Sequence, residues 1–467
     1  MHEHVKRIHF IGVGGSGMSG IAEVLTSLGY EVSGSDQSSS PVTEHLICNG
    51  IGVTIGHDAR LIENCDVVVV SSAINGNNPE VAAAMDARIP VIPRAEMLGE
   101  LMRFRKGVAI AGTHGKTTTT SLVASVLVAG GLDPTFVVGG LVNSAGRNAV
   151  LGKGDYLVAE ADESDASFLH LQPEIAVVTN IDCDHMEAYS GDFGKLKQTF
   201  IEFLANLPFY GLAVLCIDDV NVKSIAPYVR KPILTYGAHP EADVRFDRVV
   251  QNGLSMRFEV VRKGHKKPLK VELALPGAHN VCNAVAAVAI GTELGVSDND
   301  IVTALKEFAG IGRRFDVRGE LALSNGGSAL LVDDYGHHPA EIKVTLIAAR
   351  SAWPDRRLVV VFQPHRYSRT KDLMDDFSRV LCTQDPLLIT EVYPAGESQI
   401  SGADGRALCQ AIRAHGRVDP VFVSALDALG DSLSDLLRDR DVVLTLGAGD
   451  IGRASKALAH HGLGAKA

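Results

Sequence analysis

A glycine turn that ends in lysine and threonine occupies residues 112–118, with the sequence Gly-Thr-His-Gly-Lys-Thr-Thr. It follows a strand-like run at 108–111, and a helix is predicted to begin at Lys116. In a P-loop, backbone N–H groups and the lysine bind phosphates while the threonine hydroxyl reaches Mg²⁺. The turn has only two residues between its glycines, where the common P-loop has four. Its position still predicts a nucleoside-triphosphate site, with Thr117 on the metal.

A second glycine turn lies between a predicted strand at 7–13 and a predicted helix at about 16–28, with the sequence Gly12-Val13-Gly14-Gly15-Ser16-Gly17. It matches GxGxxG, in which bare backbone lets a diphosphate approach the positive end of the helix dipole. Asp36 ends the next predicted strand, where a dinucleotide fold places its ribose-binding carboxylate, so this segment alone favours NAD. The alternative is a turn that only packs the helix against the strand. Two phosphate-binding turns together indicate an enzyme that joins a nucleotide-linked substrate to ATP chemistry.

Carboxylates and one histidine follow the strands predicted near the P-loop. Glu160 ends a predicted strand at 156–160, and ligands bind at that end of the strands in open α/β sheets. Mg²⁺ prefers hard oxygen ligands, so Glu160 is the predicted metal ligand, whereas a loop histidine such as His185 is by itself more typical of a structural residue. Other acidic residues could simply cap turns or helices, Glu163 and Asp165 being the weakest candidates as ligands. The acidic residues in question are Asp162, Glu163, Asp165, Asp182 and Asp184.

Length, composition and net charge limit the number of domains and the classes of function that the protein can have. The 467 residues suggest three domains, and 46% hydrophobic residues can bury several cores. The net charge of −11 argues against a nucleic-acid-binding surface, and no apolar run approaches the length of a membrane helix. Seven cysteines without a CxxC pair predict neither a disulfide framework nor a zinc ribbon. The first residues lack the apolar core of a signal peptide, so we expect a cytoplasmic protein without a membrane partner.

The strand–turn–helix rhythm starts three times along the chain. It begins near residue 7, restarts at 108 and starts again after residue 314, with later strands predicted near 330, 358, 387, 421 and 442. Between about 232 and 275, shorter alternating segments predict an antiparallel insertion or sheet extension. The expected fold class is therefore α/β, with three consecutive α/β domains at 1–106, 107–312 and 313–467.

Taken together, the motifs resemble those of the Mur ligases of bacterial cell-wall synthesis, in the family's order, from about residue 7 to residue 453. The resemblance is carried by the turns at 12–18 and 112–118 and by the segments at 160–165, 180–186, 279–284, 333–339 and 364–369. It implies a Rossmann-like N-terminal domain for the UDP end of the substrate, a P-loop central ATPase domain, and a Rossmann-like C-terminal domain for the amino acid.

Within the family, the motifs most resemble the member that joins L-alanine to UDP-N-acetylmuramate. In the implied reaction the muramic carboxylate takes the γ-phosphoryl group of ATP, and the amine of alanine attacks the acyl phosphate. The products are an amide, ADP and phosphate, in the synthesis of peptidoglycan precursors. The resemblance thus implies three small-molecule substrates, ATP, UDP-N-acetylmuramate and L-alanine, and a metal cofactor, Mg²⁺ with Mn²⁺ as an alternative.

The resemblance also assigns roles residue by residue. For ATP it implies Gly112, Thr113, His114, Gly115, Lys116, Thr117, Thr118, Asn280, Asn283, Arg314 and Asp334. For the UDP substrate it implies Gly12, Gly14, Gly15, Ser16, Gly17, Met18, Asp36 and Ser71. For the amino acid it implies Tyr335, His365, Arg366 and Arg369, and for the metal Thr117, Glu160 and His185. The expected catalytic residues are Lys116, Glu160, His185 and Arg314.

Residue types support some of these roles and leave alternatives for others. Asn280 and Asn283 share one face of a predicted helix and so can reach one flat ligand, although Asn280 could simply cap that helix. The planar guanidinium of Arg314 suits a bidentate phosphate contact, the alternative being an interdomain ion pair. The basic run at 365–369 could bind an anion or be an exposed loop.

Three other functions stay open. A related ligase adds a preformed tripeptide to the same nucleotide sugar, and sequence does not display how open its amino-acid pocket must be. An NAD-dependent oxidoreductase would leave Lys116 idle, and a nucleotide sensor would not need Glu160, His185 and Arg314 together. Other family members carry a carbamylated lysine where this chain has Thr199 and Phe200, so that modification is not expected here. The oligomeric state is also left open.

Overall fold

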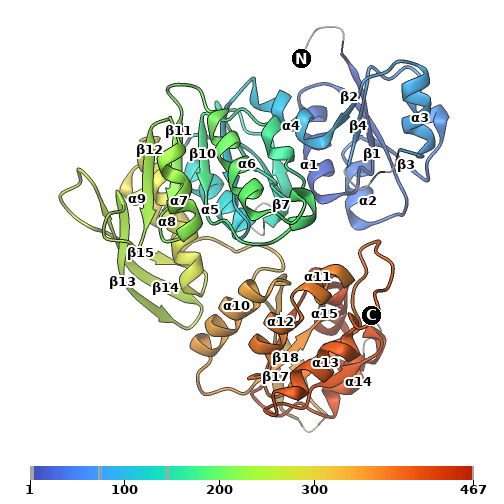
Figure 1. Cartoon of the computed structure of the whole chain (residues 1–467), viewed down its shortest axis with the longest axis vertical. Helices are drawn as coiled ribbons and strands as arrows, with labels where there is room; N and C mark the ends of the chain where they lie inside the picture. The colour runs from blue at the N-terminus through green and yellow to red at the C-terminus, as the bar shows by residue number, and fades with distance from the viewer. Residues whose placement is uncertain (1–4, 72–73, 75, 143–146, 325, 465–467) are drawn as a thin grey trace. The chain divides into compact units, whose positions relative to one another are not determined.

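A computed structural model describes the chain except residues 1–4, 72–73, 75, 143–146, 325 and 465–467. Its strands form three sheets, each with helices beside it (Figure 1). By its contacts the chain divides into two compact units, one made of 1–249, 258–273 and 280–309, the other of 250–257, 274–279 and 310–467. Among the described residues, no helix is long and apolar enough to cross a membrane.

The first sheet has five parallel strands in the order β3-β2-β1-β4-β5. These strands are β1 (Arg7–Ile11), β2 (Glu31–Asp36), β3 (Gly52–Ile55), β4 (Val67–Val70) and β5 (Val91–Pro93). The helices are α1 (Ser16–Ser27), α2 (Pro41–Cys48), α3 (Pro79–Asp86) and α4 (Arg94–Met102). Alternate residues of β1 point to opposite faces, so Phe10 packs in the core that includes α1 and α4 while Ile11 packs with residues of α3.

The second sheet has ten strands in the order β15-β14-β13-β12-β11-β10-β6-β9-β7-β8, with β6, the P-loop strand, between β10 and β9. Its strands are β6 (Lys106–Ala111), β7 (Thr135–Val142), β8 (Arg147–Val150), β9 (Tyr156–Glu160), β10 (Ile175–Val178), β11 (Leu212–Cys216), β12 (Ile233–Gly237), β13 (Val244–Asn252), β14 (Ser255–Arg262) and β15 (Leu269–Leu273). Its helices are α5 (Lys116–Ala129), α6 (Phe193–Ala205), α7 (Val220–Ile225), α8 (Ala278–Glu293) and α9 (Asp298–Lys306).

The segment at 232–275 extends this sheet, but the antiparallel expectation is wrong for its first two strands. β12 pairs parallel with both β11 and β13. A side chain supports this connection, because Asp243 accepts hydrogen bonds from the Thr235 backbone N–H at 3.0 Å and from its hydroxyl at 2.8 Å. Alternating hydrophobicity reports that a strand exists but not its direction.

The third sheet has six strands in the order β16-β17-β21-β18-β19-β20, parallel except for the edge strand β16. Its strands are β16 (Asp316–Ala322), β17 (Ser328–Asp334), β18 (Leu358–Phe362), β19 (Leu387–Thr390), β20 (Val421–Val423) and β21 (Val442–Leu446). Its helices are α10 (Pro339–Ala352), α11 (Tyr367–Asp372), α12 (Met374–Leu381), α13 (Gly405–Ala414), α14 (Leu429–Ser434) and α15 (Ile451–His461). One face packs with residues of α10, α12 and α13, and the other with residues of α14 and α15, as in a doubly wound α/β fold.

The α/β fold class is confirmed, whereas the domain boundaries at 106 and 312 stay a prediction. Both glycine turns connect a parallel strand to the helix that follows it, β1 to α1 and β6 to α5. In such sheets ligands bind at the carboxyl ends of the strands, so the fold places both turns where a ligand can reach them.

Candidate active site

The P-loop turn is shaped by two glycines with positive φ. Gly112 has φ +135° and Gly115 has φ +81°, conformations that side chains rarely adopt. A Cβ at Gly112 would collide with the Thr179 hydroxyl, and one at Gly115 would lie 2.7 Å from Oδ1 of Asn283. The first helical hydrogen bond of α5 runs from Thr119 N to Gly115 O, so the N–H groups of 116–118 precede it at the positive end of the helix. This arrangement is suited to bind phosphate.

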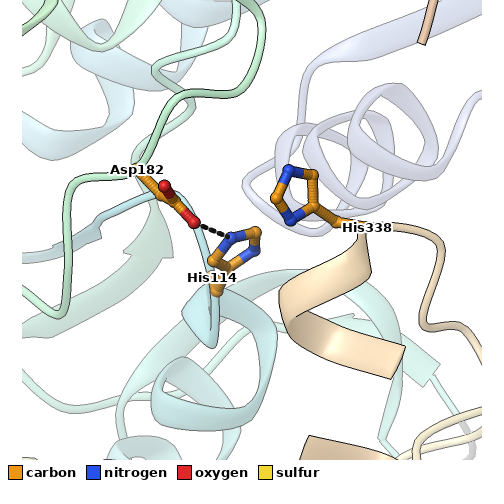
Figure 2. Close-up of side chains that lie close together, drawn as sticks. All are labelled: His114, Asp182 and His338. Carbon is orange, nitrogen blue, oxygen red and sulfur yellow. Dashed lines mark hydrogen bonds and ion pairs between the residues drawn. The ribbon is translucent and has the colours of Figure 1, made fainter. Parts of the chain in front are cut away.

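The loop after β10 holds the P-loop in place. The Asn180 carboxamide accepts a hydrogen bond from His114 N at 2.8 Å and donates one to His114 O at 2.9 Å. The Thr113 hydroxyl accepts one from Asp182 N at 2.9 Å. Nε2 of His114 lies 3.3 Å from a carboxylate oxygen of Asp182, the contact dashed in Figure 2. His114 and Thr113 therefore hold the P-loop turn in its conformation, in addition to any contact with a ligand.

Lys116 is bound to its own loop and to a buried carboxylate. Its ammonium donates to Gly112 O at 2.7 Å, to Thr113 O at 3.2 Å and to Oε2 of Glu163 at 2.7 Å. Burial lowers the pKa of Lys116, but Glu163 and the other nearby carboxylates raise it by more, so the lysine is charged. Burial raises the pKa of Glu163 to about 7, although Lys116 acts in the opposite direction. Glu163, one of the two carboxylates that the sequence ranked lowest as ligands, is thus the side-chain partner of the P-loop lysine.

The hydroxyl groups that follow Lys116 on α5 have different surroundings. The Thr120 hydroxyl donates to Lys116 O and the Ser121 hydroxyl donates to Thr117 O, each at 2.9 Å. Both are therefore engaged with the helix backbone. Thr118 and Thr119 are buried, whereas Thr117 is partly exposed at the first turn. Thr117 is therefore the best placed of these hydroxyls for a metal.

The metal ligands expected from the sequence flank the P-loop strand. Glu160 is opposite Ile110 in the parallel β6–β9 pairing, and His185 follows β10 on the other side of β6. His185 has φ +55° and its Nε2 lies 3.6 Å from an oxygen of Asp184. A hydroxyl at Thr117 and a carboxylate at Glu160 are hard oxygen donors that fit Mg²⁺, whereas the imidazole of His185 is an unusual ligand for this ion. The roles of all three residues stay predictions.

The first glycine turn is closed by the end of β2. Oδ2 of Asp36 accepts a hydrogen bond from Gly14 N at 2.9 Å, and Ser35 O accepts from Gly12 N at 2.8 Å. A Cβ on Gly14 would lie 2.9 Å from that carboxylate, so the glycine permits the close approach. Asp36 therefore holds the turn, and any ribose contact would come in addition.

An arginine after β5 covers the start of α1. A Cβ on Gly17 would lie 3.0 Å from Cδ of Arg94, and Nη2 of Arg94 lies 3.6 Å from a carboxylate oxygen of Asp162. A cavity nearby is lined by Val70, Ser71, Pro93, Arg94, Ala95, Asp165 and Ser167. The side chain of Met18 is buried in the core, and Ser16 begins α1 with a side chain outside the described part of the structure. Ser71 and Arg94 thus line the same cavity, together with the acidic residue Asp165.

Both asparagines of α8 are buried near its beginning. Asn280 is the third residue of the helix rather than its N-cap, and its Oδ1 accepts from Nδ2 of Asn283 at 3.2 Å. Asn283 in turn packs against Gly115 of the P-loop. The pair is therefore attached to the phosphate-binding turn, which agrees with, but does not test, the predicted adenine contact.

The adjacent residues Arg313 and Arg314 have different hydrogen-bond partners. Arg313 is anchored, because its guanidinium donates to Asp333 at 3.1 Å, to Gly449 O at 3.2 Å and to Gly447 O at 2.5 Å. Both guanidinium groups face the Tyr335 ring, with Arg314 5.0 Å and Arg313 5.1 Å from its centre, so the hydrogen bonds of Arg313 are what distinguish the two. Arg314 is thus the better candidate for a ligand contact.

Asp334 is buried beside these arginines. Burial raises the pKa of Asp334, although Arg314 acts in the opposite direction. Its oxygens accept hydrogen bonds from the N–H groups of Phe315 and Gly336, each at 2.8 Å. The carboxyl group therefore joins two turns in the third sheet's unit. A ribose contact at Asp334 stays a prediction.

The residues expected to bind the amino acid lie among aromatic rings. The Tyr335 ring packs edge-on against His337 at 5.4 Å, and the His365 ring stacks on Tyr393 at 5.5 Å. His337 lies 5.7 Å from His365, which connects the two pairs. The next residue, His338, lies at the start of a helix in Figure 2. It is the N-cap of α10, where its side chain accepts a hydrogen bond from Ala340 N at 3.3 Å.

The two arginines of the basic run differ in environment. Arg366 has φ +67° and precedes α11, and its backbone N–H donates to Tyr393 O at 2.8 Å. Arg369 is 8% exposed, which contradicts the alternative of a simple exposed loop. A buried guanidinium needs compensating partners, so Arg369 is packed inside its domain rather than held in a solvent-exposed loop.

Sequence reasoning missed or undervalued three residues of this site: Glu163, Asn180 and Arg94. Glu163 lies within the acidic motif, but only the fold turns its side chain to Lys116. Asn180 follows β10 by two residues, and an amide just after a strand next to a P-loop could have signalled its role. Arg94 follows a three-residue strand, where nothing in the local pattern marks it.

Family models of the Mur ligases match three successive parts of the chain. The model described as "Mur ligase family, catalytic domain" matches residues 7–106, and "Mur ligase middle domain" matches 110–291. The model described as "Mur ligase, glutamate ligase domain" matches 313–449. Together they cover most of the chain.

Individual relatives match over nearly the full length. The UDP-N-acetylmuramate–L-alanine ligase of Burkholderia mallei (strain SAVP1) is 60% identical over 452 residues, 97% of each chain. The crystal structure of the UDP-N-acetylmuramate–alanine ligase from Thermotoga maritima has a TM-score of 0.83 at 30% identity, covering 98% of this chain and 99% of that one. The murein peptide ligase from Psychrobacter arcticus 273-4 has a TM-score of 0.72 at 25% identity, with coverages of 98% and 99%.

Proposed function

The chain belongs to the Mur ligase family, and we propose that it joins L-alanine to the carboxylate of UDP-N-acetylmuramate at the expense of ATP. The observation that carries the proposal is the 60% identity, over 97% of both chains, to a ligase named for that substrate pair. The Lys116 turn and the Gly12 turn support it, because the reaction needs one phosphate site for ATP and one for the UDP end.

Lys116 and the first N–H groups of α5 would bind the terminal phosphates of ATP. When phosphates take the place of Glu163 beside Lys116, the ammonium keeps an anionic partner, so its charge stays available for the transferring phosphoryl group. The polar loop after β10 keeps the turn in shape through Asn180. We propose that Arg314 stabilises phosphate charge, and that Asn280, Asn283 and Asp334 contact the nucleoside.

Mg²⁺, for which Thr117, Glu160 and His185 are the proposed ligands, would neutralise charge that develops on the phosphates when bound. The Gly12 turn, Asp36 and the cavity lined by Ser71 and Arg94 would position the UDP substrate. Tyr335, His365, Arg366 and Arg369 are proposed to receive the alanine carboxylate. A cytoplasmic location, the choice of metal and the absence of nucleic-acid and membrane partners stay predictions.

Acceptor selectivity tests the proposal. Purified protein is supplied with ATP, Mg²⁺ and UDP-N-acetylmuramate, and phosphate release is measured with L-alanine, with the tripeptide L-alanyl-γ-D-glutamyl-meso-diaminopimelate, and with no acceptor. We expect release to depend on L-alanine. Dependence on the tripeptide alone would select the related peptide ligase, and no dependence on either acceptor would refute the ligase assignment.

A further inference from the structure

Two cysteines that are far apart in the sequence meet beside α8. Cys216 ends β11, Cys282 lies in the first turn and a half of α8, and their Sγ atoms are 3.4 Å apart. Cys216 is 3% exposed and Cys282 is half-buried. The two sulfur atoms therefore form a close pair between a buried and a half-buried cysteine.

A carboxylate completes this group. Asp218 is exposed, and one oxygen of its carboxylate, the Cys216 sulfur and the Cys282 sulfur lie within 4.8 Å of one another. The carboxylate is fixed by the loop after β12, because Ala238 N donates to Oδ2 at 2.7 Å and His239 N donates to Oδ1 at 2.8 Å. Each oxygen keeps a further lone pair, and hydrogen-bonded carboxylates are typical of metal ligands.

The electrostatics of the thiols also suit a cation. A hydrogen bond with Cys282 lowers the pKa of Cys216. The same hydrogen bond, burial and the nearby Asp218 carboxylate raise the pKa of Cys282. A bound cation would favour the thiolate form of both residues.

We propose that Cys216, Asp218 and Cys282 form a binding site for one thiophilic divalent cation, with Zn²⁺ as the best match. Two thiolates and one carboxylate supply three ligands of types that Zn²⁺ accepts, and water can supply the fourth. Hard cations such as Mg²⁺ prefer sites made of oxygen alone, so this site is chemically distinct from the one proposed at Thr117 and Glu160.

Co²⁺ provides a spectroscopic test, because thiolate ligation gives a sulfur-to-cobalt charge-transfer band in the near ultraviolet. The full chain is freed of metal with a chelator, kept reduced with a phosphine, and titrated with Co²⁺ in the presence of excess Mg²⁺. We expect the band to saturate at one Co²⁺ per chain and to disappear when Zn²⁺ is added. Absence of a saturable band in the unmodified protein would overturn the proposal.

Variants assign the band to these residues. Cys282→Ser, at the half-buried position, should abolish it, and Asp218→Asn should weaken Co²⁺ binding by at least about tenfold. Cys409→Ser, at a buried cysteine in the third sheet's unit, and Cys48→Ser, at an exposed one, are controls that should keep it. Zn²⁺ should also raise the thermal unfolding midpoint of the unmodified chain and not that of Cys282→Ser. A band that persists in Cys282→Ser would overturn the assignment.

Discussion

The ammonium of Lys116 lies 2.7 Å from a carboxylate oxygen of Glu163, a residue that is only 1% exposed. Two backbone carbonyls of the P-loop, Gly112 O and Thr113 O, accept hydrogen bonds from the same ammonium. Phosphates that bind this turn must therefore compete with groups that already surround the lysine. We therefore expect Lys116 to affect turnover, and Glu163 to affect how the affinity for ATP depends on pH.

Replacing Lys116 or Glu160 should stop turnover and spare binding of the UDP substrate. Lys116→Ala and Glu160→Ala should each lower kcat by roughly a thousandfold or more, because charge on the transferring phosphoryl group loses its stabilisation. Phosphate release measures turnover, and calorimetric titration measures binding of UDP-N-acetylmuramate. Equal loss of binding would show that the division of labour between the first and second sheets is wrong.

The affinity for ATP should fall as the pH rises through about 7. Burial raises the pKa of Glu163 to about 7, against the effect of Lys116. When phosphates replace Glu163 as the partner of Lys116, the pKa of Glu163 should rise further. ATP binding is then coupled to proton uptake by Glu163. The affinity for ATP therefore falls at pH values where Glu163 is ionised before ATP binds. Above pH 7, the Kd for ATP should rise by up to about tenfold per pH unit if one proton is taken up for each ATP bound.

Glu163→Gln separates this effect from the titration of ATP itself. The amide keeps an oxygen acceptor for Lys116 and carries no charge at any pH, so the slope of log Kd for ATP should be shallower than in the unmodified enzyme. Calorimetric titration between pH 6.5 and 8.5, in buffers of different ionisation enthalpy, gives both Kd and the number of protons taken up. Identical slopes for the two proteins would contradict the proposed exchange of partners.

Neighbouring arginines should behave differently when truncated. Arg313→Ala should lower the free energy of unfolding by about 2–4 kcal/mol, because it leaves the buried Asp333 with one partner fewer and removes donors from two glycine carbonyls. Arg314→Ala should lower the thermal midpoint less than Arg313→Ala does, and it should lower kcat/KM for ATP. Denaturant unfolding and steady-state kinetics on both variants measure the contrast, and equal destabilisation would refute it.

Gly115 can be tested against a matched glycine at the other end of the same helix. Gly115 has φ +81° and Gly131 has φ +72°, so an alanine at either position costs about 1 kcal/mol of backbone strain. Only at Gly115 does the added Cβ meet another side chain, that of Asn283. Gly115→Ala should raise KM for ATP by about tenfold or more, whereas Gly131→Ala should lower stability alone. A similar KM in both variants would contradict a phosphate-binding role for the turn.

Local patterns in the sequence determine much of this protein. The buried runs at Val108 and Ile175, each followed by turn residues, predict β6 and β10, and the glycines predict the two turns because few other residues adopt their φ values. The motif order predicts the family, which the family models confirm. Such features depend on neighbours along the chain, so they can be read from it directly.

Tertiary structure alone decides which distant groups meet. Lys116 and Glu163 are 47 residues apart, and Cys216 and Cys282 are 66 residues apart, yet each pair is in contact. Strand direction is also a tertiary result, as the parallel pairing of β12 and β13 shows. Side-chain type and spacing indicate whether a segment is a helix or a strand and which of its residues could bind a ligand or act in catalysis. The partner that a side chain meets depends on sheet order and helix packing, which arise only when the whole chain has folded.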